Sequence, residues 1–251
     1  MKRLLMLILL YCSACTAAPK PNNNNSKPVS HVLWNQLLHE HVSAKGIVDY
    51  KGMIKDSVKL NMYLKLLSDN PPQQSWTQDE QKAYWINAYN AFTVKLITKY
   101  YPVKSIKDIG SSIQIPFVNT PWEIKFFKIG GKTFNLDKIE HGILLKQFND
   151  PRIHFAIVCA SASCPQLRNE AYDATKLNQQ LDSQATRFIN DPTRNKITPD
   201  KIEISKIFLW YKGYFTHNGS LIDYLNKYSK VKIHPDATIS HLDYNWSLNG
   251  E

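Results

Sequence analysis

The sequence predicts an α+β fold, a single mixed domain with a central apolar strand, hairpins and several packed helices. Three observations lead to this class. Helical patterns alternate with short extended segments, Gly130-Gly131 and Pro199-Asp200 are typical of tight turns, and residues 153–160 are apolar on both alternating faces. The 251 residues show neither an internal repeat nor a second domain boundary.

Residues 1–18 have the pattern of a secretory signal peptide. Two basic residues precede a short apolar run, residues 4–11, which is too short to span a bilayer, and small residues follow it. The tripeptide that ends in Cys15 resembles the end of a bacterial lipobox, although Cys12 stands where leucine is usual. The alternative is ordinary signal-peptidase cleavage after Ala17 or Ala18. Both predict an exported protein, either in the periplasm or anchored to the cell envelope, and the only membrane contact expected is the N-terminal lipid of the lipobox alternative.

Residues 19–29, with four consecutive asparagines, are expected to form a polar linker, and residues 30–251 to form the folded domain. Ser30 is the expected N-cap of a first helix, and residues 57–68 predict a second one.

A capping-box sequence at Thr77 and Glu80 predicts a long helix from residue 78 to about residue 100. Its apolar face includes Asn90, with Asn87 at the edge. A buried amide needs hydrogen-bond partners, and these two could bind backbone groups or orient a functional site.

A hairpin is expected over residues 116–135, followed by a helix over residues 136–148 that carries Glu140 and His141. Helical spacing places His141 on the packed side, with Leu144, Leu145 and Phe148.

The apolar segment 153–160 is the expected central strand, with His154 as its polar interruption. Pro165 favours the first turn of a helix, which would place Cys164 near a helix N-cap, where N–H groups and the helix dipole lower the pKa of a thiol. A helix over residues 173–190, a hairpin over residues 196–204 and a short helix opened by Ser220 are expected to follow.

Charge and histidine spacing exclude several classes of partner. The formal net charge is +10, but Lys and Arg are scattered and form no run, so no nucleic-acid partner is predicted. His31, His39 and His41 lie in one helix pattern without a metal-ligand spacing. We therefore expect no metal site and no cofactor.

Several short motifs lie along the chain, among them Tyr-Trp-Ile-Asn-Ala-Tyr-Asn at 84–90, Ile-Glu-His-Gly-Ile-Leu at 139–144, Ser-Cys-Pro at 163–165 and Phe-Ile-Asn-Asp-Pro at 188–192. In this order they resemble the DUF547 family, a domain named for its unknown function. Residues 145, 166, 214 and 245 depart from the usual pattern; Leu145, for example, stands where the family usually has Arg. The resemblance implies a mixed α/β domain, often in secreted bacterial proteins, and supplies no established activity.

The enzymatic hypothesis is a thiol hydrolase or transferase that acts on peptide or amide bonds. Cys164 would be the nucleophile and His141 the base, in preference to His154, while Glu140, Asn87 or Asn90 would orient the imidazole.

The alternative is a non-catalytic binding or structural module of the periplasm in which Cys159 and Cys164 form a disulfide. Its ligand would be an unidentified small molecule or peptide. Thiol–disulfide exchange is a third, weaker hypothesis, because redox pairs usually have two intervening residues and these have four. The residues expected at the binding site are Asn90, His154, Trp210 and Tyr211.

Overall fold

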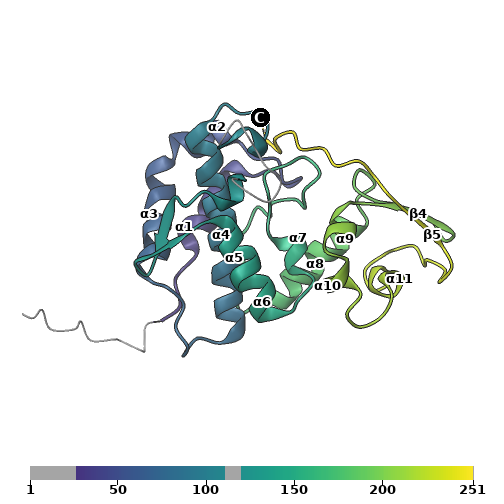
Figure 1. Ribbon diagram of the computed structural model, residues 1–251. Coiled ribbons are helices and arrows are strands. Elements are labelled where there is room, and N and C mark those ends of the chain that lie inside the picture. The colour runs from purple at the N-terminus through teal and green to yellow at the C-terminus, as the bar shows by residue number, and fades with distance from the viewer. Residues whose placement is uncertain (1–26, 111–119, 251) are drawn as a thin grey trace, which may run out of the picture.

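The computed structural model describes residues 27–110 and 120–250, in which helices pack together with two small sheets (Figure 1). This confirms the α+β class. The predicted signal peptide with Cys15, and most of the predicted linker, lie outside the described residues. The elements are α1 (Val32–His41), α2 (Tyr50–Lys55), α3 (Ser57–Asp69), α4 (Gln78–Tyr100), η1 (Ile106–Asp108), η2 (Pro121–Glu123), β1 (Phe127–Ile129), β2 (Lys132–Phe134), α5 (Leu136–Ile139), η3 (Glu140–Leu144), α6 (Leu145–Phe148), α7 (Ile153–Ala156), α8 (Leu177–Ile189), β3 (Lys196–Ile197), β4 (Lys201–Ile204), α9 (Ile207–Trp210), α10 (Lys212–Phe215), α11 (Leu221–Leu225) and β5 (Thr238–His241).

Helix α4 is the longest helix of the described chain, and much of it is buried. Its predicted N-terminus is confirmed: Thr77 Oγ1 accepts a hydrogen bond from the Glu80 N–H, and the Glu80 carboxylate accepts one from the Thr77 N–H. Residues 82–94 are buried without interruption, because neighbouring elements, α2, α3 and α5 among them, cover several faces of the helix.

The predicted central strand over residues 153–160 is wrong. Its first half is the short helix α7, and residues 157–160 belong to no strand among the described residues: Ile157 is extended, whereas Ala160 has a positive φ of 59°. The side chain of Asn90 takes the place of a neighbouring strand: its Nδ2 donates to the Ala156 carbonyl and its Oδ1 accepts from the Val158 N–H, both at 2.9 Å. An apolar run buried by helices has the same pattern as one buried in a sheet.

Both predicted hairpins are present, with shorter strands. Gly130 and Gly131, both at positive φ, join β1 to β2, and β3 pairs antiparallel with β4. Strand β5 then adds to β4 in parallel. After β5 the C-terminal segment, yellow in Figure 1, runs back across the molecule, where Leu248 bridges Ser161 and Gly250 bridges Val48.

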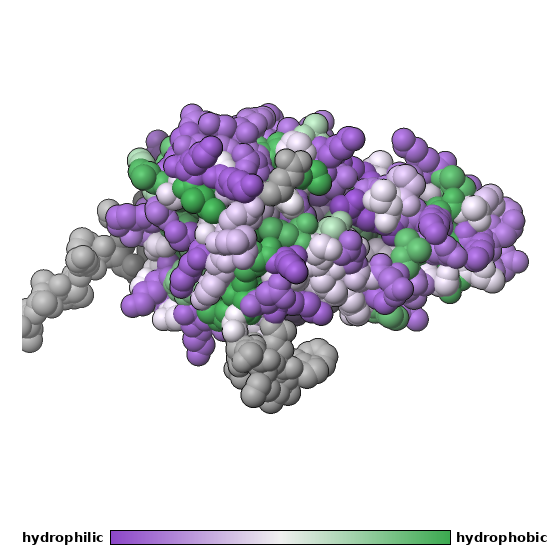
Figure 2. All heavy atoms as spheres, turned by 90° about the horizontal axis from the view of Figure 1, so that it is seen from above, coloured by the Kyte–Doolittle hydropathy of each residue, from purple (hydrophilic) through white to green (hydrophobic). Residues whose placement is uncertain are grey.

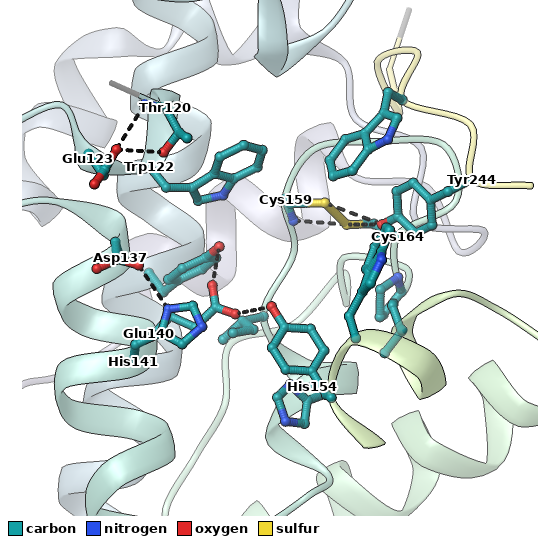
Figure 3. Close-up of a pocket in the computed structure, with 17 residues that line it drawn as sticks. Thr120, Trp122, Glu123, Asp137, Glu140, His141, His154, Cys159, Cys164 and Tyr244 are labelled. Atoms are coloured by element: carbon teal, nitrogen blue, oxygen red, sulfur yellow. Dashed lines mark hydrogen bonds and ion pairs between the residues drawn. A yellow bond between two sulfur atoms is a disulfide. The ribbon is translucent and has the colours of Figure 1, made fainter. Parts of the chain in front are cut away.

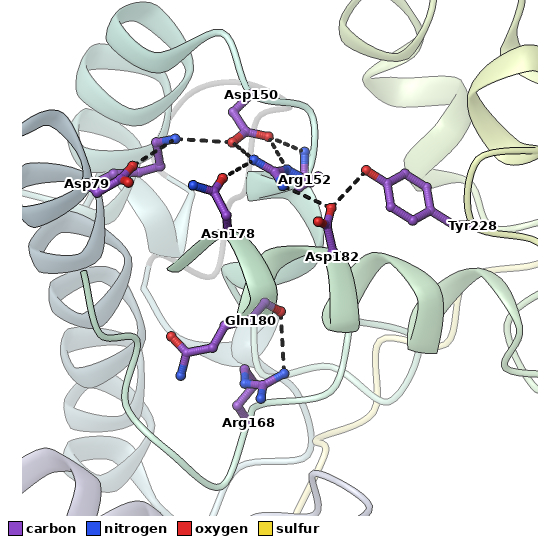
Figure 4. A network of polar contacts seen from close by, with 9 residues as sticks. Asp79, Asp150, Arg152, Arg168, Asn178, Gln180, Asp182 and Tyr228 are labelled. Atoms are coloured by element: carbon purple, nitrogen blue, oxygen red, sulfur yellow. Dashed lines mark hydrogen bonds and ion pairs between the residues drawn. The ribbon is translucent and has the colours of Figure 1, made fainter. Parts of the chain in front are cut away.

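A chain of ion pairs joins α4, α7 and α8 (Figure 4). Lys82 Nζ lies 3.1 Å from Asp150, and Arg152 contacts Asp150 at 2.8 Å and Asp182 at 2.9 Å. Tyr228 donates to Asp182 from the far side at 3.2 Å. These contacts fix the start of α7, and with it His154, between the two longer helices.

Hydrophilic side chains cover most of the face shown in Figure 2, with apolar side chains exposed between them. Within the described ranges, no helix combines the length and the apolar character that a bilayer crossing requires.

Candidate ligand-binding site

A cavity of about 480 Å³ lies where two hydrophobic clusters meet. Ile157 belongs to the first cluster and Ile207 to the second, while Tyr211 packs against both. Such junctions are common places for ligand sites. The lining side chains come from α4, η2, α5, η3, α7, α9 and the segments between elements (Figure 3): Tyr89, Thr120, Trp122, Glu123, Asp137, Glu140, His141, His154, Ile157, Cys159, Cys164, Pro165, Ile207, Trp210, Tyr211, Tyr244 and Trp246.

Glu140 is the buried carboxylate of this cavity, with 6% of its surface exposed. It accepts hydrogen bonds from the hydroxyls of Tyr211, at 2.7 Å, and Tyr89, at 3.0 Å. Burial, followed by the charge of Glu140, raises the pKa of both phenols well above the ordinary value, so both remain donors. Glu140 also begins the π-helical turn η3, a rare geometry that is frequent at functional sites.

His141 lies at the exposed edge of the cavity, with 52% of its side chain exposed, and its Nδ1 lies 2.9 Å from Asp137 Oδ1. The prediction that it faces packed surface is wrong. That prediction assumed 3.6 residues per turn, and the wider π turn between Glu140 and Leu144 changes the phase of the helix.

His154 is buried on α7, and its ring centroid lies 4.0 Å from that of Tyr211. Burial lowers its pKa to about 3, and the charge of His141 acts in the same direction. The imidazole is therefore neutral near pH 7. Its Nε2 has no hydrogen-bond partner within the part of the chain that the structure describes.

Aromatic rings form a second wall. The ring centroids of Trp210 and Tyr244 are 4.8 Å apart, those of Tyr244 and Trp246 are 4.6 Å apart, and Trp122 lies 6.0 Å from Trp246. The sequence identified Trp210 and Tyr211 as binding residues, and both line the cavity. It missed Trp122, Tyr244 and Trp246. Tyr244 and Trp246 were missed because the long return of the C-terminal segment has no signal in local sequence.

Cys159 and Cys164 form a disulfide that lines the cavity (Figure 3). In this state Cys164 has no thiolate, and only 3% of its surface is exposed. The predicted helix at Pro165 is also wrong, because the next helix, α8, begins at Leu177. The helix N-terminus that was expected to activate Cys164 is therefore not there.

Residues 73–189 match the family described as "Protein of unknown function, DUF547". The chain carries a DUF547 domain. Comparison with curated proteins found no match, and comparison with solved structures found none either.

The segment that matches DUF547 supplies only part of the cavity lining. It includes Glu140, His141, His154 and both cysteines, and it ends before Trp210. The acidic side and the disulfide therefore lie in the matched segment, whereas most of the aromatic wall comes from the chain that follows it.

Asn87 and Asn90 do not line this cavity. Asn87 Nδ2 donates to the Tyr172 carbonyl at 2.8 Å, and its Oδ1 accepts from the Tyr172 N–H at 2.9 Å. Asn90 holds the backbone around Val158 in the same way. Of the two interpretations left open by the sequence, backbone binding is the one that the structure shows for both residues, and the amide of Asn87 bonds Tyr172 rather than His141.

The charge of the cavity is opposite to that of the whole chain. Glu123, Asp137 and Glu140 line it, and none of its described lining residues is Lys or Arg. The chain as a whole has a formal net charge of +10. Carboxylates in a cleft with low-dielectric walls focus a negative potential there, which attracts cations and repels anions.

Elsewhere in the described part of the chain, one group of side chains has ligand atoms close enough to hold a metal ion: Glu40, His41 and Asp56, within 4.8 Å of one another. His41 Nε2 lies 2.7 Å from Asp56 Oδ2, and Lys59 pairs with Glu40 at 3.4 Å. These contacts satisfy the group as an ion-pair cluster, and the absence of a metal stays a prediction.

Proposed function

We propose that this chain is an exported binding module whose cavity takes a small organic cation, an amine or quaternary ammonium group on a compact apolar body. One observation carries the proposal: three carboxylates line a cavity with an aromatic wall, and none of its described lining residues is Lys or Arg, in a chain of net charge +10. A volume of about 480 Å³ suits a small molecule.

Both sides of the cavity offer favourable contacts to the cationic group of such a ligand. Cations bind favourably over the faces of Trp and Tyr rings, and the interaction strengthens in a site shielded from water. Figure 3 shows Asp137, Glu140 and His141 on one side, with Tyr244 and the disulfide opposite. A cation between these sides would contact the rings and remain in the field of Glu140.

Export is supported by two features. The basic pair and apolar run of residues 1–18 are typical of a signal peptide, and a disulfide persists in oxidising compartments outside the cytoplasm. Cell fractionation tests this part: the protein is expected in the envelope fraction, and a Cys15→Ala variant is expected to be released from the membrane. Recovery of both proteins from the cytosol would contradict it.

The thiol-hydrolase hypothesis is the less supported of the two. A nucleophilic cysteine must be a thiolate, whereas Cys164 is bonded to Cys159. Titration with Ellman's reagent of a full-length protein carrying Cys12→Ser and Cys15→Ser tests this directly. We expect no free thiol in the native protein. One free thiol per chain, together with hydrolysis of an amide substrate that Cys164→Ser abolishes, would favour the hydrolase instead.

A matched pair of ligands tests whether binding depends on the positive charge. Choline and 3,3-dimethylbutan-1-ol have nearly the same shape and differ in charge. Titration followed by tryptophan fluorescence and calorimetry is expected to show choline binding about tenfold or more tightly, which corresponds to ~1.4 kcal/mol. Equal affinities, or tighter binding of an anion of similar size, would contradict the proposal.

Substitutions of lining residues test whether choline binds in this cavity. Glu140→Gln and Trp210→Ala are each expected to weaken choline binding about tenfold, since one charge or one ring contributes on the order of 1–2 kcal/mol. Leu209→Ala, an exposed neighbour of Trp210 that does not line the cavity, and Glu203→Gln on β4 are the controls. Both controls are expected to bind as the unmodified protein does.

A further inference from the structure

We propose that the Cys159–Cys164 disulfide is a thiol–disulfide exchange site that reacts from the cavity, with Cys159 as the attacked sulfur and Cys164 as the leaving group. Both residues line the cavity. Cys159 is half-buried, whereas Cys164 is 3% exposed, so a thiol that enters the cavity meets Cys159 first. This proposal depends on the disulfide and its neighbours and not on the cation.

Two hydrogen-bond donors point at the sulfur of Cys164. The Cys159 N–H lies 3.0 Å from Cys164 Sγ, and the Tyr244 hydroxyl lies 3.4 Å from it. Ser161 Oγ in turn donates to the Tyr244 hydroxyl at 3.1 Å, which leaves the phenolic proton for the sulfur. Donors that bond the charged form lower the pKa of a thiol, and a low-pKa thiol is the better leaving group in exchange.

The Tyr244 hydroxyl remains a hydrogen-bond donor over the pH range of thiol–disulfide exchange, because burial raises its pKa to about 12. The hydroxyl also lies 3.5 Å from Cys159 Sγ, so it stays beside both sulfurs as the bond between them breaks.

Hydrogen bonds from residues other than the two cysteines hold the loop that carries Cys164. Arg194 Nε donates to the Cys164 carbonyl at 2.7 Å, and its Nη2 donates to the Ala162 carbonyl at 2.9 Å. The Asn245 N–H donates to Ser163 Oγ at 2.9 Å. The loop therefore keeps its place when the S–S bond opens, and the thiolate remains beside its donors.

The exchange balances as follows. A small-molecule thiolate attacks Cys159 Sγ, a new S–S bond forms, and the Cys159–Cys164 bond breaks with its electron pair on Cys164 Sγ. A second thiol attacks the small-molecule sulfur, displaces Cys159 as thiolate and leaves as a small disulfide. Two thiols are oxidised and the protein disulfide is reduced by two electrons, while water supplies or takes up the protons.

The carboxylates of the cavity predict which thiol reacts fastest, and this one preference rests on the proposed function. Cysteamine carries a positive charge, 2-mercaptoethanol is neutral and 3-mercaptopropionate is negative. With rates expressed per thiolate, we expect cysteamine to react fastest and 3-mercaptopropionate slowest. Equal rates for the three thiols would refute the charge preference, whereas native-state exchange by any of them supports the exchange site.

The experiment uses full-length protein carrying Cys12→Ser and Cys15→Ser, so that only the cavity pair reacts. Reduction is stopped by alkylation and followed by mass spectrometry, and the mixed disulfide is mapped by peptide digestion. We expect a rate proportional to thiol concentration, unaffected by low urea, and a mixed disulfide on Cys159. A rate independent of thiol concentration that rises with urea, or a mixed disulfide on Cys164, would overturn the proposal.

Removing the Tyr244 hydroxyl tests its role. Tyr244→Phe is expected to slow exchange about tenfold, the effect of losing one hydrogen bond to a charged group. Ser161→Ala, which removes the donor behind Tyr244, is expected to slow it less. Tyr228→Phe, whose hydroxyl donates to Asp182 instead, is the matched control and should exchange normally. Unchanged rates in folded Tyr244→Phe would show that the phenol does not assist the leaving thiolate.

Discussion

The hydroxyl of Tyr211 donates to the carboxylate of Glu140 at 2.7 Å, across 71 residues of sequence. The hydroxyl of Tyr89 donates to the second carboxylate oxygen at 3.0 Å. A buried carboxylate is costly unless such donors replace water. The two phenols therefore stabilise a negative charge in the wall of the cavity, and each residue of this trio depends on the others.

Tyr211→Phe should destabilise the fold by about 1.5–3 kcal/mol, because it takes one donor from a buried charge. In a Glu140→Gln background the same substitution should cost clearly less, since the charge is gone. Urea unfolding of the four proteins of this double-mutant cycle measures the coupling. Strictly additive effects would show that the two groups do not interact in solution.

Asn90→Ala should cost about 2–4 kcal/mol, because it leaves a buried carbonyl and a buried N–H around residue 157 without partners. Choline affinity of the folded variant should change little, since Asn90 does not line the cavity. Asn61→Ala, at an exposed position, is the control and should change stability by less than ~0.5 kcal/mol. Lost binding by a folded Asn90→Ala protein would return this residue to the functional site.

Asp150→Asn should destabilise the protein at pH 7 by about 3–5 kcal/mol, because it leaves Lys82 and Arg152 without their half-buried partner. Burial alone would raise the pKa of Asp150, but hydrogen bonds from Arg152 and the charges of Arg152 and Lys82 outweigh it and hold the pKa below 3.8. This stabilisation is present above pH 3.8 and is lost as the pH falls through the lower folded-state pKa.

The stability difference between the Asp150→Asn variant and the parent should therefore shrink below pH 4. Thermal unfolding between pH 7 and pH 2.5 measures it. Asp69→Asn, which removes an exposed pair with Lys65, is the control and should change stability by less than ~1 kcal/mol. A difference that stays constant down to pH 2.5 would disagree with the ion-pair assignment.

His154 should make the stability of the fold decrease with falling pH, and this decrease should begin at a higher pH than the decrease caused by the carboxylates. Its folded pKa is about 3, against 6.5 when exposed, so between these values the unfolded chain binds a proton that the folded chain does not. Stability therefore falls as the pH drops below 6.5, by about 2 kcal/mol from this group at pH 5. His154→Phe should flatten this slope, and His39→Gln, at an exposed position, should not.

Patterns of local sequence predicted a large part of the fold. The capping box at Thr77, the glycine pair at residues 130–131 and the serine cap at Ser220 act through neighbours within a few residues, so each fixes its own element. The apolar run at residues 153–160 was misassigned, because alternation records only that both faces are buried and not what buries them. His141 was misplaced by the π turn, which has no sequence signature of its own.

The sequence by itself determined the α+β class, the DUF547 resemblance and the boundaries of the long helices α3 and α4, since these follow from residue spacing along the chain. Only the tertiary structure decided that Cys164 is bonded to Cys159, that Asn87 and Asn90 hold backbone, and that Tyr244 and Trp246 return to the cavity. These are contacts that depend on how distant segments pack. Their free energy comes from burial and from hydrogen bonds between groups that no local pattern connects.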